Sequence, residues 1–133
     1  MATYNWELFL DFAKFLMSQS NIAVDKETAN RIAISRAYYA AFHVAKDFLV
    51  SANISYLYAG GEHDRVCNTF KNLNKGDKAF LTTCHRIGNY LTVLKGNRHT
   101  ADYDDRKTFN DAETKKCYYS AKQIIEDVKS LVQ

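Results

Sequence analysis

The sequence contains no proline and only five glycines in 133 residues. These two residue types interrupt helices and form the tight turns of β-proteins, so their scarcity favours long, uninterrupted helices. Apolar residues make up 47% of the chain and aromatic residues 14%, which is sufficient for one buried core in a chain of this length. The composition predicts an all-α fold in a single domain that spans residues 1–133.

The sequence also lacks the usual features of secreted, zinc-binding and membrane proteins. Its three cysteines, Cys67, Cys84 and Cys117, are an odd number and have no CxxC or Cys/His pairing at zinc-finger spacing. The N-terminal stretch MATYNWELFLDF has acidic residues inside its apolar run and no basic segment before it, unlike a signal peptide or a membrane span. We expect a cytoplasmic protein with free thiols and no membrane association.

The charge balance is too even to indicate a binding partner. The net charge of +3 is the difference between 18 basic and 15 acidic residues. A field this weak does not identify a nucleic-acid-binding protein, although it leaves room for a local basic patch.

Apolar spacing and capping residues predict two helices in the first half of the chain. The first is expected over residues 4–18, with Asn5 or Thr3 as its cap. The second is expected over residues 26–52, with Asp25 accepting hydrogen bonds from its first amides. At about 1.5 Å per residue this helix is about 40 Å long, so we expect it to be the spine against which the other helices pack.

The second half of the chain predicts one short helix and two long ones. The short helix is expected over residues 62–72, and Asp77 caps the helix that follows the turn at Gly76. Asn110 and Glu113 form a capping-box pair before the last helix. The predicted fold is therefore an antiparallel up-and-down bundle of four main helices and one short helix.

The expected second helix carries a polar stripe within the stretch SRAYYAAFHVAKD. At about 100° per residue, Arg36, Tyr39 and His43 fall on one side of the helix, beside a stripe of small residues that allows another helix to approach closely. In one interpretation these are a partly buried arginine held by a carboxylate, a core aromatic and a core histidine. In the other, they bind a ligand.

A second polar cluster lies in the stretch GNRHTADYDDR, at the expected end of the fourth helix. If that helix continues, Arg98 and Asp102 point toward the bundle and can pair, since they are four residues apart. One interpretation is an ordinary salt bridge at a helix end, and another is a binding site. The neighbouring carboxylates have neither EF-hand nor zinc-site spacing, so we predict no metal and no other cofactor.

The two clusters together resemble the HEPN superfamily, the higher eukaryotes and prokaryotes nucleotide-binding domain. SRAYYA on a long second helix, followed by ADYD at the end of a later helix, is similar to the small stand-alone bacterial and archaeal HEPN proteins. The resemblance implies a helical bundle that commonly dimerises. It also implies a toxin–antitoxin or defence-type system, with a nucleotidyltransferase or another antitoxin protein as partner.

Many proteins of this superfamily are metal-independent ribonucleases, and their usual motif is an arginine with a histidine four to six positions later. Here Arg98 is followed by His99, but Asp102, Tyr103 and Asp104 occupy the positions of the distal histidine. The sequence departs from the superfamily pattern at the residue expected to transfer the proton.

Two functional hypotheses follow. The first is an RNA endonuclease in which a histidine accepts the proton of the ribose 2′-hydroxyl and an arginine stabilises the phosphorane. The second is a non-catalytic module that binds RNA, a nucleotide or a protein, with tyrosines such as Tyr38 stacking on a base; a purely structural helical protein is a third reading. The candidate catalytic residues are Arg36, His43, Arg98, His99 and Asp102, and the candidate substrate-binding residues are Tyr39, Tyr103 and Asn97.

Two expectations concern geometry and assembly. We expect the two polar clusters to converge on one cleft, with Arg36, Tyr39 and His43 facing Arg98, Asp102 and Tyr103. We also expect a homodimer, because nine tyrosines and eight phenylalanines are more aromatic surface than a small bundle hides easily.

Overall fold

The computed structural model describes residues 4–19, 25–56 and 60–132. These ranges contain five α-helices and no β-strand. The helices are α1 (Glu7–Ser18), α2 (Lys26–Ser51), α3 (Glu62–Asn72), α4 (Lys78–Tyr103) and α5 (Asp111–Leu131). The prediction of an all-α fold with one short helix between the second and third long ones is confirmed.

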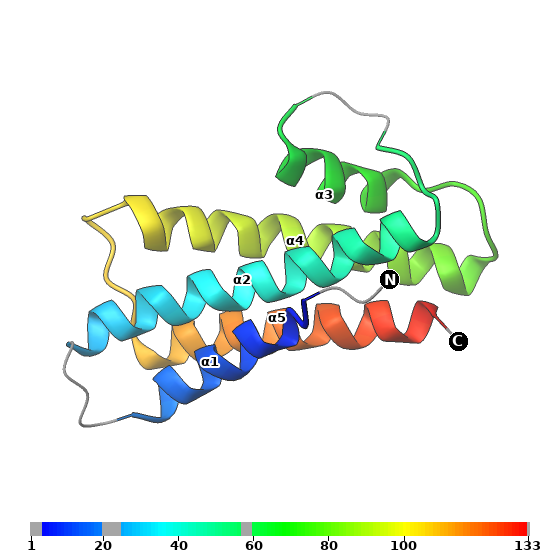
Figure 1. The fold of residues 1–133 in the computed structure, drawn as a ribbon. Coiled ribbons are helices and arrows are strands. Elements are labelled where there is room, and N and C mark those ends of the chain that lie inside the picture. The colour runs from blue at the N-terminus through cyan, green and yellow to red at the C-terminus, as the bar shows by residue number, and fades with distance from the viewer. Residues whose placement is uncertain (1–3, 20–24, 57–59, 133) are drawn as a thin grey trace.

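The helices form an antiparallel bundle (Figure 1). α1 and α4 run in one direction, and α2 and α5 run in the other. α2 packs against α1, α4 and α5, and α5 also contacts both α1 and α4. The short helix α3 lies outside this bundle and packs mainly on α4, with a smaller contact to α2.

The capping residues identified in the sequence begin three of the helices. Asp25 and Asp77 each accept a hydrogen bond from the backbone amide three residues later, at 2.8 and 2.9 Å. Asn110 and Glu113 exchange hydrogen bonds between side chain and backbone, at 2.8 and 3.1 Å. These bonds satisfy amides that have no partner within the helix, so they fix where each helix starts.

The sequence predicted that the first helix begins at Tyr4, but it begins at Glu7. The Asn5 side chain accepts a hydrogen bond from the Glu7 amide at 3.1 Å. The rings of Tyr4 and Trp6 pack edge to face, with their centroids 4.9 Å apart. The aromatic residues before Glu7 are thus held by each other. Thr3, the other predicted cap, lies outside the described residues.

α2 is the spine of the fold because its buried surface consists largely of alanine. Small side chains let the backbones of neighbouring helices approach closely, and α2 contacts every other helix. The larger side chains of Tyr38 and Phe42 fill the remaining core space and are fully buried. The buried alanines of α2 are Ala29, Ala33, Ala37, Ala40, Ala41 and Ala45.

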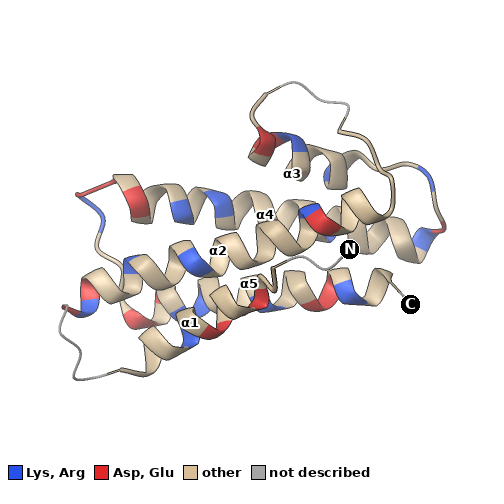
Figure 2. Ribbon diagram, viewed as in Figure 1, with Lys and Arg blue, Asp and Glu red and all other residues tan. Residues whose placement is uncertain are grey.

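Charged residues of both signs are distributed over the whole bundle. Basic and acidic residues are interspersed along the helices, and every helix carries both signs (Figure 2).

Cys67, Cys84 and Cys117 are buried and unpaired, and burial raises the pKa of Cys84 and of Cys117 to about 11. These two thiols are therefore protonated at neutral pH and are poor nucleophiles. None of the helices in the described ranges combines the length and apolarity needed to cross a membrane.

α3 packs closely against α4 at Gly88, where there is no space for a side chain. A Cβ at this position would lie 2.7 Å from the backbone nitrogen of Lys71 and 3.0 Å from the carbonyl oxygen of Cys67. We expect Gly88→Ala to destabilise the fold by about 1–3 kcal/mol, because the helix backbones must separate.

Gly96 is the matched control, since a Cβ there meets nothing within 4 Å. Gly96→Ala should raise the free energy of unfolding by about 0.5–1 kcal/mol through helix propensity alone. Urea unfolding of both variants measures the difference. Equal stability changes in the two variants would contradict the close α3–α4 contact.

Candidate functional site

Arg98 lies near the C-terminal end of α4, against the tyrosines of α2. Its side chain is only 11% exposed. The guanidinium carbon lies 5.2 Å from the centroid of the Tyr38 ring and 5.5 Å from that of Tyr39, within the range of cation–π attraction. Its Nη1 is 3.6 Å from Asp102 Oδ2. Within the described ranges, the buried Nε has no hydrogen-bond partner, so Arg98 retains an unused donor.

Asp102 and Arg36 line the same surface pocket between α2 and α4. The pocket has a volume of about 270 Å³, and Ser35 also lines it. Asp102 Oδ2 accepts a long hydrogen bond of 3.5 Å from Ser35 Oγ. The Arg36 guanidinium carbon lies 5.2 Å from the ring centroid of Phe9 in α1. Arg36 therefore leans toward α1 at one side of the pocket, while Asp102 lies on the α4 side.

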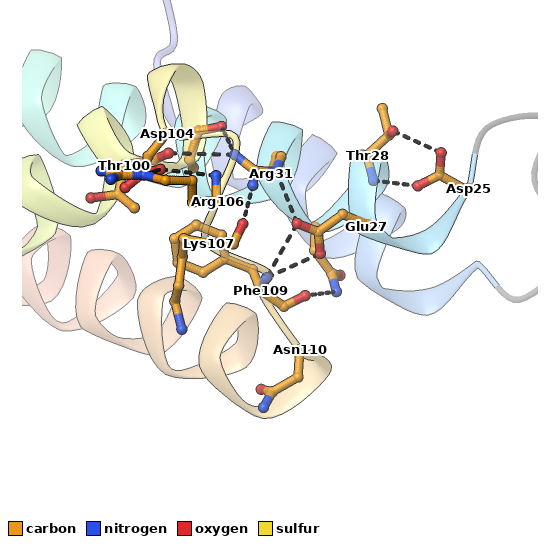
Figure 3. A network of polar contacts seen from close by, with 12 residues as sticks. Asp25, Glu27, Thr28, Arg31, Thr100, Asp104, Arg106, Lys107, Phe109 and Asn110 are labelled. Atoms are coloured by element: carbon orange, nitrogen blue, oxygen red, sulfur yellow. Dashed lines mark hydrogen bonds and ion pairs between the residues drawn. The ribbon is translucent and has the colours of Figure 1, made fainter.

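Arg31 connects α2 to the end of α4 (Figure 3). Its Nη1 donates hydrogen bonds to the carbonyl oxygens of Thr100 and Ala101 at 3.4 and 2.8 Å, and its Nη2 donates to that of Lys107. Its Nε donates to Glu27 at 2.9 Å. The Thr100 carbonyl also accepts a hydrogen bond from the Asp104 amide at 2.9 Å, whereas the Ala101 carbonyl lies in the last turn, where carbonyls lack a partner within the helix. The guanidinium supplies that partner and so holds the α4 terminus in place.

Glu27 extends this connection to the segment between α4 and α5. Its two carboxylate oxygens accept hydrogen bonds of 3.2 and 3.0 Å from the Phe109 amide. Asn30 donates to the Phe109 carbonyl at 3.1 Å. The first turns of α2 therefore fix the connecting segment as well as the end of α4, and with it the position of Arg98 and Asp102.

His43 lies on the α1 side of the polar stripe. Its ring stacks on Trp6, with centroids 3.7 Å apart and an interplanar angle of 13°. The Tyr39 ring is 6.2 Å away. Burial, together with the positive charge of Lys46, holds the pKa of His43 below the usual 6.5. His43 is consequently neutral at neutral pH, but its closest aromatic neighbour is Trp6 rather than a residue of α4.

His63 of α3 is a site residue that the sequence analysis missed. Its Nδ1 is 2.5 Å from the Tyr38 hydroxyl, and its ring stacks on Phe42 with centroids 4.1 Å apart. Burial and the nearby Arg98 guanidinium lower the pKa of His63. The spacing in the sequence could have identified His63 as an inward-facing residue. It precedes the buried Val66 by three residues, which puts both on the inner face of α3.

Three predicted site residues lie apart from Arg98 and Tyr39. Asn97 lines a different pocket, between α4 and α5. The rings of His99 and Tyr103 lie beside each other, 5.0 Å apart, and Tyr103 is 71% exposed. The structure therefore brings part of the two predicted clusters together, namely Tyr39 with Arg98 and Arg36 with Asp102, and leaves Asn97, His99 and Tyr103 outside that contact.

The acidic segment after Arg98 does not present a metal site. Across the described ranges, no three His, Cys, Asp or Glu side chains are arranged to hold a metal ion. Asp104 instead accepts a hydrogen bond of 2.9 Å from the Arg106 amide, which lowers its pKa. The carboxylate of Asp104 therefore stabilises the turn that follows α4.

The Arg31 connection predicts a large effect of truncation. We expect Arg31→Ala to lower the free energy of unfolding by about 2–3 kcal/mol, because it leaves Glu27 and several partly buried carbonyls without their charged partner. Amide exchange in residues 104–109 should accelerate more than exchange in the first half of α4. Arg106→Ala is the control, since the Arg106 side chain is 88% exposed and pairs with Asp104. A change no larger than that of Arg106→Ala, about 0.5 kcal/mol, would contradict the structural role of Arg31.

Comparison with known proteins identifies the family. A family model described as HEPN domain matches residues 6–131, a segment that includes all five helices. Searches of curated proteins and of solved structures gave no match. The family match agrees with the helical bundle and with the expected HEPN superfamily. The chain belongs to the HEPN domain family.

Proposed function

We propose that this chain is a metal-independent RNA endonuclease of the small stand-alone HEPN type. Membership in the HEPN family supports a nucleotide-binding or ribonuclease-like module. The observation that carries the finer proposal is the environment of Arg98: a nearly buried guanidinium beside two tyrosines, with an unused donor at Nε. A phosphate that reaches the exposed part of this guanidinium would form charge-assisted hydrogen bonds with it.

The proposed reaction is an internal transesterification, in which the phosphorus is transferred from the 5′-oxygen to the neighbouring 2′-oxygen. The 2′-oxygen attacks the adjacent phosphorus, the bond from phosphorus to the 5′-oxygen breaks, and the products are a 2′,3′-cyclic phosphate and a 5′-hydroxyl. A histidine takes the 2′-proton, and water protonates the departing 5′-oxygen. Arg98 stabilises the negative charge that develops on the phosphorane, which is strongest in a site that excludes water.

Tyr39 supports substrate binding at the same place. It is half-buried, and its ring contacts the Arg98 guanidinium. An aromatic ring at the edge of a phosphate site can stack on a nucleobase of any identity. We therefore propose Arg98 as the phosphate-binding residue and Tyr39 as the base-stacking residue, with Asp102 orienting the guanidinium through their 3.6 Å contact.

A non-catalytic binding module is the second candidate function. It is favoured by Asp102, Tyr103 and Asp104 at the positions where the HEPN ribonuclease motif has its distal histidine. In this case Arg98 and Tyr39 bind RNA or a nucleotide and no bond is broken.

For either function, we propose that the chain acts in the cytoplasm in a toxin–antitoxin or defence system. Its partner would be an antitoxin such as a nucleotidyltransferase, and co-purification of the two would show the pairing.

The ribonuclease proposal predicts cleavage that depends on Arg98 and persists in EDTA. With mixed RNA and excess EDTA, we expect the wild type to yield fragments with 2′,3′-cyclic phosphate ends. Arg98→Ala should lower the rate by about 100-fold or more, as removal of a transition-state donor does. Lys122→Ala is the control, because it removes an exposed positive charge from α5 without touching the site.

The two candidate functions give different results in this assay. No cleavage by the wild type, combined with RNA binding that Arg98→Ala abolishes, would favour the binding module. Cleavage that Arg98→Ala leaves intact would contradict the assignment of Arg98 in the ribonuclease.

We also propose that the chain forms a homodimer through α1. Leu8, Phe12 and Phe15 lie on the outer face of α1 and are 47%, 47% and 54% exposed. Large apolar side chains clustered on one exposed helix face are typical of an interaction surface. Charge introduced at the centre of such a face should prevent association, because a desolvated carboxylate without a partner is costly.

Phe12→Asp should therefore convert a dimer into a monomer in light scattering at about 50 µM, a concentration at which weak dimers with micromolar Kd remain associated. Val50→Asp is the control, since Val50 is 61% exposed at the far end of α2. A wild-type monomer at this concentration, or a dimer that survives Phe12→Asp, would contradict the α1 interface.

A further inference from the structure

We propose that His63 of α3 is the proton-transfer residue of this HEPN chain, replacing the distal histidine that its α4 motif lacks. The inference rests on the proposed ribonuclease function and assigns its missing catalytic group. It places the arginine and the histidine of the site on two different helices, with Tyr38 of α2 between them.

Tyr38 brings the two groups together. Its hydroxyl is 2.5 Å from His63 Nδ1, and its ring lies 5.2 Å from the Arg98 guanidinium carbon. Tyr38 is fully buried, so it forms a fixed support rather than a surface contact. Both functional side chains therefore touch one immobile ring, which holds an imidazole and a guanidinium at a set separation.

The hydrogen bond to Tyr38 leaves one nitrogen of His63 for chemistry. Burial raises the pKa of Tyr38, so its hydroxyl keeps its proton and can donate or accept in the contact with Nδ1, depending on the imidazole tautomer. The proposed base is the tautomer in which Nδ1–H donates to this hydroxyl. In that tautomer the Nε2 lone pair is free, and no group in the described ranges bonds to it. His63 is half-buried rather than enclosed, and the proposed reaction requires its Nε2 to face the substrate.

The charges around His63 suit a neutral proton acceptor. Two lysines, Lys46 and Lys95, pair with the residues on either side of it, Glu62 at 3.0 Å and Asp64 at 2.6 Å, so each lysine is balanced by a carboxylate. Burial, together with Arg98 and Lys95, still lowers the pKa of His63 and keeps its imidazole neutral, which is the form that accepts a proton.

The proton balance of the step is simple. His63 Nε2 takes the proton of the 2′-hydroxyl as the 2′-oxygen bonds to phosphorus, and the bond to the 5′-oxygen breaks. Arg98 contacts the phosphoryl oxygens. The 5′-oxygen takes a proton from water, and the imidazolium later returns its proton to solvent, so the enzyme ends the cycle unchanged.

The other histidines are less suited to this role. His43 has its ring face covered by Trp6. His99 lies beside the exposed Tyr103. His85 is engaged through its Nε2 with the carbonyl of Leu73 at 2.8 Å. In the described part of the chain, His63 is the only histidine that is hydrogen-bonded to a tyrosine, Tyr38, whose ring also contacts the Arg98 guanidinium.

The pH dependence follows from the groups that face His63. Tyr38 and His43 face it from α2, Glu62 and Asp64 lie beside it on α3, and Lys95 and Arg98 face it from α4. Burial and the cations outweigh the acidic neighbours and lower the pKa of His63 below 6.5. A base works only when deprotonated, so the rate should rise with pH up to this lowered pKa and stay level above it.

The decisive variant is His63→Gln, which keeps a side chain able to bond to Tyr38 but cannot take a proton. In an RNA cleavage assay with EDTA, we expect kcat to fall by about 100-fold or more while KM changes by less than about 3-fold. The acid limb of the pH–rate profile should disappear. His85→Gln is the matched control, and circular dichroism with thermal melting should verify that each variant folds.

Each outcome separates this inference from the proposed function. If His63→Gln cleaves like the wild type, or if only His43→Gln or His99→Gln loses activity, His63 is not the base and the ribonuclease proposal stands. If the wild type cleaves no RNA at any pH, the ribonuclease proposal fails and the role of His63 fails with it. If His63→Gln does not fold, the wild-type profile decides: a rate that stays level from neutral pH down to the lowest pH at which the wild type remains folded would overturn the inference.

Discussion

The close packing of α2 against the other helices is the constraint on which the rest of the structure depends. Its alanine-rich surface allows α1, α4 and α5 to approach it at once, and α3 contacts it as well. A helix covered on so many sides leaves only a narrow stripe for polar chemistry. Ser35, Arg36, Tyr39 and His43 lie on that stripe, so the packing itself determines which residues of α2 can take part in a site.

Two arginines at the α2–α4 boundary differ in how many of their donors have a partner. Arg31 donates to Glu27 and to carbonyl oxygens at and beyond the end of α4. Arg98 has one carboxylate contact and a buried Nε with no partner within the described ranges. A guanidinium whose donors are used holds the structure together, whereas Arg98 is less fully engaged in structural hydrogen bonds, and we therefore propose it as the anion-binding residue.

Much of the fold could be predicted from local features of the sequence. Asp25, Asp77 and the Asn110–Glu113 pair begin their helices as expected, because capping depends on residues only three positions apart. The contact of Arg98 with Asp102 could also be predicted, since it depends on helical spacing. The start of α1 differed because aromatic packing at Tyr4 and Trp6 is not visible in the capping pattern.

The rest of the site could not be predicted because it depends on contacts between residues distant in the sequence. His63 reaches Tyr38 across 25 positions, and Arg31 reaches Ala101 across 70. Neither residue belongs to a recognisable motif. His43 was expected near α4, yet it stacks on Trp6, because the polar stripe of α2 lies between two neighbouring helices, α1 and α4. Spacing identifies a face of a helix but not the partner on that face.

The central claim is that Arg98, the tyrosines of α2 and the beginning of α3 form one RNA-binding site. It is tested most directly by NMR mapping of backbone amides during titration with a 2′-deoxy oligonucleotide, which binds but lacks the attacking hydroxyl. The account predicts that the largest shifts fall in residues 35–43, 62–64 and 95–102. Shifts concentrated in α5, or an absence of shifts at concentrations where RNA itself binds, would contradict it.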